Sequence, residues 1–266
     1  MSQTETTTIN IDGRRLKVGI RRGGGVPLLI FNGIGANLEM LEPLTSALEG
    51  IETIVFDVPG VGGSAVSALP YGLRGLARLA DKVLKKLGYH SEVDVLGVSW
   101  GGAPAQQFAR MYPRRCRRLV LAATTAGVLM VISSPLQLAK MLARRRHTDP
   151  EYLLKVAAEL YGGEVRRNPE IMRVYTSKVK APHWLGYLHQ QIALCGWTSL
   201  FWLPLLRQRT LVLAGRDDPL APVINSRILA SLIPRAKLHI VNDGHLFLMT
   251  GAHNAAPVIR TFLMAQ

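Results

Sequence analysis

Residues 93–109 read VDVLGVSWGGAPAQQFA, and this stretch decides the fold. The apolar run at 93–97 is typical of a strand covered on both faces, and the spacing from residue 103 onward is helical. Between them, GVSWG fits the pattern G-x-S-x-G, with Ser99 at the turn. At such a strand-to-helix turn the serine backbone is strained, and the flanking glycines allow close packing that leaves Oγ exposed. The stretch therefore predicts a nucleophilic serine, although a serine that caps a helix in a noncatalytic α/β protein also fits it.

The residue after Ser99 is a candidate for stabilising negative charge. Trp100 lies where the first backbone amides of the following helix point, so its N–H is a candidate oxyanion donor. Pro104 falls in the first turn of that helix, where its missing N–H costs nothing.

The rest of the chain repeats the alternation of strand and helix. Apolar runs that predict strands lie at 27–31, 53–57, 93–97 and 119–123, and helical patterns lie at 38–48, 73–87 and 103–111. Strands separated by helices of this length predict βαβ units and a parallel sheet. At the start, residues 8–20 carry an Asp12-Gly13 turn between alternating runs, which predicts a hairpin at the sheet edge.

The alternation stops between residues 127 and 206. It resumes with strands at 210–215 and 237–241, a helix between them and another at the end. The intervening segment is helical in character and holds Trp184, Trp197 and Trp202. We therefore expect one compact α/β core formed by residues 1–126 and 207–266, with residues 127–206 as a helical insertion.

An acid and a base follow the two later strands, as a nucleophilic serine requires. TLVLAGRDDPLAP ends its strand in Asp217 and Asp218; Asp218, directly before Pro219, is the better placed acid, whereas Asp217 fits a turn residue. HIVNDGHLFL presents His245 behind Gly244 after the last strand, which makes it the expected base rather than a surface histidine.

A second oxyanion donor is expected in the loop FNGIGAN after the first parallel strand. Gly33 allows close approach there and Ile34 supplies the N–H, although a plain glycine-rich turn is the alternative. The chain shows no phosphate-binding Gly-rich motif and no Cys/His cluster at metal-ligand spacing, so no cofactor and no metal are expected.

The net charge and the composition limit the classes of binding partner that the protein can have. The formal net charge of +14 attracts acidic surfaces, with arginine clusters at 110–118 and 144–146, but no nucleic-acid-binding module accompanies them. We therefore expect surface arginines and no nucleic-acid partner.

Residues 119–139 form a run of 21 residues without a charge, which is the length of a membrane span. The polar residues inside this run favour a strand and a loop without a transmembrane span. Only Cys116 and Cys195 are present, and the start of the chain shows no signal peptide, so the cytoplasm and two buried free thiols are expected.

Several strings together resemble a known family. LLIFNGIGANLEM, FDVPGVGGS, GVSWGGAPAQQFA, RLVLAATTAG, GWTSL, LVLAGRDDPLAP and NDGHLFL are similar to the intracellular medium-chain-length poly(3-hydroxyalkanoate) depolymerases, a branch of the α/β-hydrolase superfamily. The similarity runs from about residue 9 to residue 263. Asn32 and Pro59 stand where most other α/β hydrolases carry His-Gly and Asp-x-Arg-Gly patterns.

The resemblance implies an α/β-hydrolase fold with a mostly parallel eight-stranded sheet, helices on both faces and a lid formed by residues 127–206. It implies Ser99 as nucleophile, Asp218 as acid and His245 as base. It also implies hydrolysis of storage polyester to 3-hydroxy acids or oligomers at the surface of cytoplasmic granules, with no cofactor. A polymer without charge does not explain the arginines of this insertion, which include those at 144–146 and 166–167.

Two other functions fit the same residues. A general carboxylesterase or lipase-like hydrolase would use the same triad on small soluble esters. A noncatalytic ligand-binding or granule-coating protein would use the fold alone.

Overall fold

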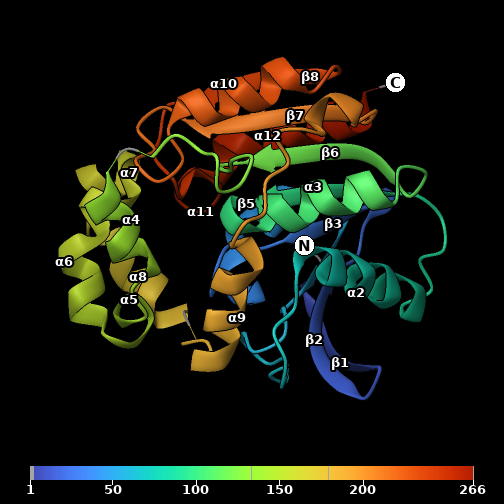
Figure 1. Ribbon diagram of the computed structural model, residues 1–266, viewed down its shortest axis with the longest axis horizontal. Coiled ribbons are helices and arrows are strands. Elements are labelled where there is room, and N and C mark those ends of the chain that lie inside the picture. The colour runs from blue at the N-terminus through green and yellow to red at the C-terminus, as the bar shows by residue number, and fades with distance from the viewer. Residues whose placement is uncertain (1–2, 133, 179, 266) are drawn as a thin grey trace.

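The computed structural model describes residues 3–132, 134–178 and 180–265, and eight strands of this chain form one sheet (Figure 1). The strand order is β1-β2-β4-β3-β5-β6-β7-β8. The strands are β1 (Glu5–Ile11), β2 (Arg14–Arg21), β3 (Gly24–Phe31), β4 (Ile51–Phe56), β5 (Val93–Val98), β6 (Cys116–Ala122), β7 (Arg209–Gly215) and β8 (Ala236–Val241). The pairings of β2 with β1 and with β4 are antiparallel and the others are parallel, which confirms the predicted sheet.

The predicted hairpin forms the edge of this sheet. Asp12 and Gly13 both have positive φ, +51° and +77°, which is the conformation of a tight turn whose twist matches the flanking strands. β1 pairs with β2 along its whole length, from Glu5 opposite Ile20 to Ile11 opposite Arg14.

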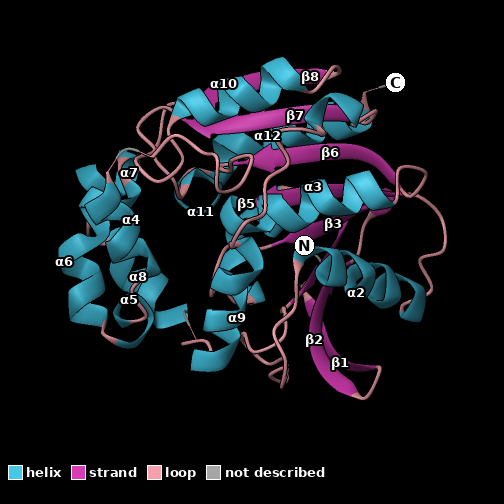
Figure 2. Ribbon diagram, in the orientation of Figure 1, coloured by secondary structure: helices cyan, strands magenta, loops and turns pink. Residues whose placement is uncertain are grey.

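Helices cover both faces, because side chains of the central strands alternate between two hydrophobic clusters. Leu29 and Phe31 of β3 pack on one face and Leu28 and Ile30 on the other. The first face is covered by α2 (Leu73–Lys86), α3 (Gly102–Met111) and α10 (Val223–Leu232) (Figure 2). The second face is covered by α1 (Glu42–Ala47), α11 (Phe247–Thr250) and α12 (Ala252–Met264).

The helix predicted at 38–48 is divided into two. A 3₁₀ turn, η1 (Leu38–Leu41), precedes α1, and Pro43 lies in the first turn of α1. Proline has no N–H to donate to the preceding turn, so one continuous helix through residue 43 is disfavoured.

The segment between β6 and β7 is helical, as predicted, but it consists of short pieces. They are α4 (Pro135–Leu142), α5 (Arg145–Thr148), α6 (Pro150–Tyr161), α7 (Gly163–Arg167), α8 (Ile171–Lys178), α9 (Trp184–Leu194) and the 3₁₀ turn η3 (Leu203–Leu205). Helices α4 to α8 gather beyond one end of the sheet, whereas α9 lies nearer β5 (Figure 1). An antiparallel bridge between Gly127 and Thr198 closes the base of the insertion.

The uncharged run at 119–139 is divided between β6, a loop and α4. Within the described parts of the chain, no helix has both the length and the apolar character needed to cross a bilayer. Both cysteines are free. The expectation that both are buried is wrong for Cys195, which is exposed directly after α9, whereas Cys116 at the start of β6 is buried.

Candidate active site

Ser99 lies at the sharp turn between β5 and α3. Its φ is +52°, which is strained for a residue with a side chain, and this is the predicted feature of the turn. The neighbouring glycine is required for space, because a Cβ on Gly101 would lie 2.1 Å from the carbonyl oxygen of Phe31 in β3. Thr124, just after β6, donates from Oγ1 to the carbonyl of Ser99 at 2.7 Å. The turn is thus held against both neighbouring strands.

The structure brings Ser99, His245 and Asp218 together, although they are separated by up to 146 positions in sequence. Ser99 Oγ lies 2.9 Å from His245 Nε2, and His245 Nδ1 lies 2.8 Å from Asp218 Oδ2. Asp218 is only 5% exposed and His245 7%. A hydroxyl, an imidazole and a carboxylate in this order form the arrangement that activates a serine nucleophile.

Asp218 is held in place by backbone amides. Its Oδ1 accepts hydrogen bonds from the N–H groups of Leu220 and Ala221, both at 2.9 Å, so Oδ2 stays directed at the imidazole. Asp217, which was expected to be a turn residue, lies outside this arrangement. It is exposed, it accepts from Gly163 N–H at 2.8 Å, and it forms an ion pair with Arg166 that ties α7 to the core.

Two residues that orient His245 were not predicted. The backbone N–H of His245 donates to the carbonyl of Tyr161 at 2.7 Å, and the two rings stack with centroids 6.4 Å apart. Asp243 accepts from Gly244 N–H, from Glu164 N–H and from Thr250 Oγ1, which fixes the turn before the imidazole. The Asp-Gly pair before His245 is a turn signal that could have identified Asp243, whereas Tyr161 lies too far away in sequence to leave one.

The loop at 32–37 lies directly against the nucleophile. A Cβ on Gly33 would lie 3.8 Å from Ser99 Cβ, and Ile34 and Trp100 both line the cavity that contains Ser99. The side chain of Asn32 holds the loop from within, because its Oδ1 accepts from Gly33 N–H at 2.8 Å and its Nδ2 donates to the carbonyl of Asn37 at 2.9 Å. The two residues predicted to supply oxyanion donors thus both line the cavity beside Ser99.

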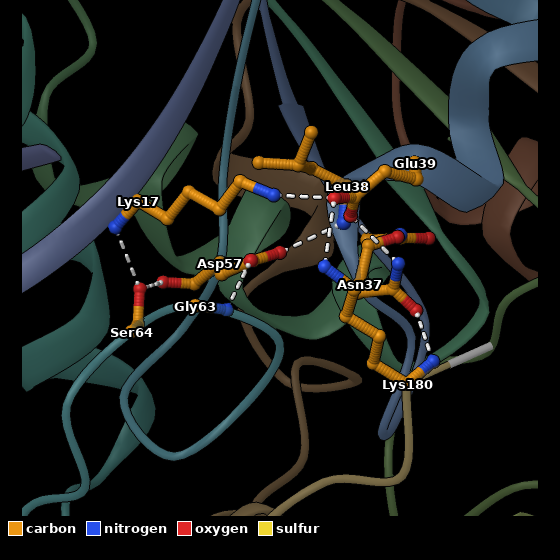
Figure 3. A network of polar contacts seen from close by, with 9 residues as sticks. Lys17, Asn37, Leu38, Glu39, Asp57, Gly63, Ser64 and Lys180 are labelled. Carbon is orange, nitrogen blue, oxygen red and sulfur yellow. Dashed lines mark hydrogen bonds and ion pairs between the residues drawn. The ribbon is translucent and has the colours of Figure 1, made fainter. Parts of the chain in front are cut away.

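A polar network supports the far end of this loop (Figure 3). Buried Asp57, just after β4, accepts from the N–H groups of Leu38 at 2.7 Å and of Gly63 at 2.9 Å. Lys17 pairs with Glu39 beside it. Burial raises the pKa of Asp57 to about 6, since desolvation outweighs the two amide hydrogen bonds. Hydrogen bonds from Asn37 and Lys17 outweigh desolvation at Glu39 and lower its pKa to about 2.

A cavity of about 730 Å³ opens from Ser99 under the insertion. This volume is within the range of small-molecule sites. Leucine and methionine side chains of the insertion line this cavity, whereas Trp184, Trp197 and Trp202 do not. Trp197 and Trp202 instead pack against the core. Its apolar lining from the insertion comprises Val128, Met130, Ile132, Leu138, Ala139, Met141, Leu142, Ala143 and Leu194. A second cavity of about 50 Å³ lies beside Ser99, next to Arg146 and Tyr161.

Comparison with known proteins decides the family. Residues 26–252 match the family described as "alpha/beta hydrolase fold". The chain belongs to the α/β-hydrolase fold family. This α/β hydrolase is 50% identical over 262 residues to the poly(3-hydroxyalkanoate) depolymerase of Ectopseudomonas oleovorans, and the match covers 97% of this chain and 92% of that protein.

Solved structures agree with this fold. The enol-lactonase of Burkholderia xenovorans LB400 superposes on this α/β hydrolase with a TM-score of 0.82 at 21% identity, covering 97% of this chain and 99% of that chain. A thermophilic esterase of Thermogutta terrifontis superposes with a TM-score of 0.79 at 25% identity, covering 98% of each chain.

Proposed function

We propose that this ester hydrolase of the α/β-hydrolase family cleaves poly(3-hydroxyalkanoate) with medium-length side chains, through an acyl-enzyme on Ser99. The observation that carries the proposal is the hydrogen-bonded chain from Ser99 Oγ through His245 to Asp218, which opens into a large apolar cavity. The 50% identity to a poly(3-hydroxyalkanoate) depolymerase supports the choice of substrate.

In the first half of the reaction, His245 Nε2 takes the proton of Ser99 as Oγ attacks the ester carbonyl. Asp218 stabilises the imidazolium that forms. The N–H groups of Ile34 and Trp100 stabilise the oxyanion, and such donors are each worth two to three orders of magnitude in kcat in comparable sites, roughly. The tetrahedral intermediate collapses, the ester C–O bond breaks, and the leaving alkoxide takes the proton from His245.

In the second half, water attacks the acyl group on Ser99 while His245 takes the proton of that water. The small cavity beside Ser99 has room for such a water. The acyl–Oγ bond then breaks, Oγ regains its proton from the imidazolium, and a 3-hydroxy acid or short oligomer leaves.

The apolar lining of the cavity supports a substrate with alkyl side chains of medium length. Its lining from the insertion is mainly aliphatic, so an alkyl side chain that enters it leaves water. Each buried methylene contributes about 0.8 kcal/mol. We assign residues 127–206 as a lid over this cavity and residues 1–126 and 207–266 as the hydrolase core.

Exposed apolar side chains next to the cavity support action at a granule surface. Large apolar side chains are exposed on the segment that follows Gly127, namely Val128, Leu129, Val131, Ile132 and Leu136. Val128 and Ile132 also line the cavity, so these exposed apolar side chains adjoin the site. Exposed apolar patches of this kind are typical of interaction surfaces, and a polyester granule offers an apolar partner.

A small soluble ester is the second candidate substrate, because the cavity also has room for a single acyl chain. The two are separated by measuring acid release from purified medium-chain polyester granules, from a short-chain polyester and from a soluble p-nitrophenyl ester. The proposal expects release from medium-chain granules by the wild type and none by Ser99→Ala. Hydrolysis of the soluble ester alone would favour the second candidate, and equal release by both proteins would remove Ser99 from the mechanism.

A further inference from the structure

The peptide that joins Ile34 to Gly35 is held on both sides by the insertion. Gly35 N–H donates to Gln190 Oε1 at 2.9 Å, and the carbonyl of Ile34 accepts from Arg146 Nη2 at 3.4 Å. Adjacent peptide planes share the α-carbon of Ile34. Fixing this plane therefore limits how far the N–H of Ile34, one of the two proposed oxyanion donors, can turn away from the site.

Gln190 also contacts the residue that carries the other donor. The indole Nε1–H of Trp100 donates to the backbone carbonyl of Gln190 at 2.9 Å, in a buried hydrogen bond. One residue of α9 thus makes a hydrogen bond to Trp100 and another to the amide that follows Ile34. These partners lie 90 and 155 positions away from it in sequence.

The burial of Gln190 argues that its side-chain oxygen is what this position requires. Its exposed fraction is 0%, and within the described structure its Nε2 has no hydrogen-bond partner. Burying an unpaired donor costs about 1–3 kcal/mol. A methionine of similar size would fill the same space without that cost, but it could not accept the hydrogen bond from Gly35 N–H.

The insertion also leaves no space for a side chain at Gly35. Gly35 has φ +69°, and a Cβ there would lie 2.6 Å from Nε2 of His147 in α5. The loop therefore packs closely against side chains of α5 and α9, in addition to its contacts with Asn32 and Asp57 of the core.

We propose that Gln190 is a positioning residue of the oxyanion hole, which makes α9 a fixed part of the active site. This inference rests on the proposed function of Ser99. Gln190 touches neither substrate nor reacting atoms; its amide oxygen and its carbonyl hold the two donor-bearing segments at their places beside Ser99.

The test compares Gln190→Met, Gln190→Asn and Gln190→Glu with the wild type, using a soluble p-nitrophenyl ester of a medium-chain acid. Methionine lacks the acceptor, asparagine is one methylene too short to reach Gly35 N–H, and glutamate keeps an acceptor oxygen in place. His189→Leu is the matched control, because His189 is adjacent on α9 and 2% exposed, and its ring contacts Tyr71, which lies outside the loop at 32–37. Affinity for a trifluoromethyl ketone, which binds as a tetrahedral oxyanion, is measured beside kcat and KM.

We expect Gln190→Met and Gln190→Asn to lower kcat about 10- to 100-fold with KM within about threefold, since aligned oxyanion donors act on the transition state. In these two variants the affinity for the ketone should fall by the same factor as kcat. The kcat of Gln190→Glu should stay within about fivefold of the wild-type value. His189→Leu should leave kcat, KM and ketone affinity near those of the wild type. The inference is overturned if Gln190→Asn keeps wild-type kcat, or if His189→Leu loses kcat and ketone affinity to the same extent. Activity that persists in Ser99→Ala would instead overturn the proposed function.

Discussion

The stability of the protein is expected to depend on pH through Asp57, the buried carboxylate that holds Leu38 N–H directly after the loop at 32–37. Burial raises the pKa of Asp57 from its ordinary 3.8 to about 6. The folded state therefore binds this proton more tightly than the unfolded chain does, so the contribution of Asp57 is fully present below pH 3.8 and is lost as pH rises through 6. At about 1.36 kcal/mol for each pKa unit, the loss amounts to roughly 3 kcal/mol.

The assay is urea unfolding of the wild type and Asp57→Asn, followed by tryptophan fluorescence at pH 4, 5, 6 and 7. Asparagine cannot accept both amide hydrogen bonds, which is a fixed cost, so the pH-dependent part of the difference reports the carboxyl group. The advantage of the wild type over Asp57→Asn is expected to shrink as pH rises from 4 to 7.

Glu39→Gln is the matched control from the same network. The pKa of Glu39 is lowered to about 2, so its contribution is present above pH 4.5 and is lost only as pH falls toward 2. The difference between wild type and Glu39→Gln should therefore change far less from pH 5 to 7 than the difference for Asp57→Asn, and only because the charge of Glu39 contributes to the raised pKa of Asp57. If the advantage over Asp57→Asn stays constant or grows across pH 4 to 7, the reasoning about burial is refuted.

Three further substitutions probe the turn, the triad and the cavity. Gly101→Ala places Cβ 2.1 Å from the carbonyl of Phe31, so it should lower the free energy of unfolding in urea by about 1–3 kcal/mol. Gly75→Ala in α2 is the control: its Cβ meets open space, so it should raise the free energy of unfolding by about 0.5–1 kcal/mol. Equal effects of the two substitutions would contradict the packing argument. Asp218→Asn should lower kcat about 10⁴-fold because the amide favours the wrong imidazole tautomer, and a loss below tenfold in steady-state assays would remove Asp218 from the triad. Leu138→Trp fills part of the cavity and should lower kcat/KM for an octanoate ester at least tenfold more than for a butyrate ester, a shift of about 1.4 kcal/mol; an unchanged ratio would place the acyl chain elsewhere.

The core of the fold could be predicted because its signals are local. Continuous apolar runs mark strands buried on both faces, and the Asp12-Gly13 pair marks the hairpin. The convergence of Ser99, Asp218 and His245 could be predicted for the same reason, since each follows a strand of a parallel sheet and the carboxyl ends of such strands share one edge.

Contacts between the insertion and the core could not be predicted in this way. Gln190, Tyr161 and Arg146 reach the site through tertiary packing over long sequence separations, and neither their types nor their spacing indicates it. The exposure of Cys195 could not be predicted for a related reason, because it depends on where α9 ends, and helix ends are set by packing as much as by sequence.

The central claim is that His245 activates the hydroxyl of Ser99. It is tested most directly by the rate at which a fluorophosphonate labels the protein, with the modified residue located by peptide mass spectrometry. The account predicts one adduct, on Ser99, formed at least about 10³-fold more slowly in His245→Ala. An adduct on another residue, or equal labelling rates in the two proteins, would contradict it.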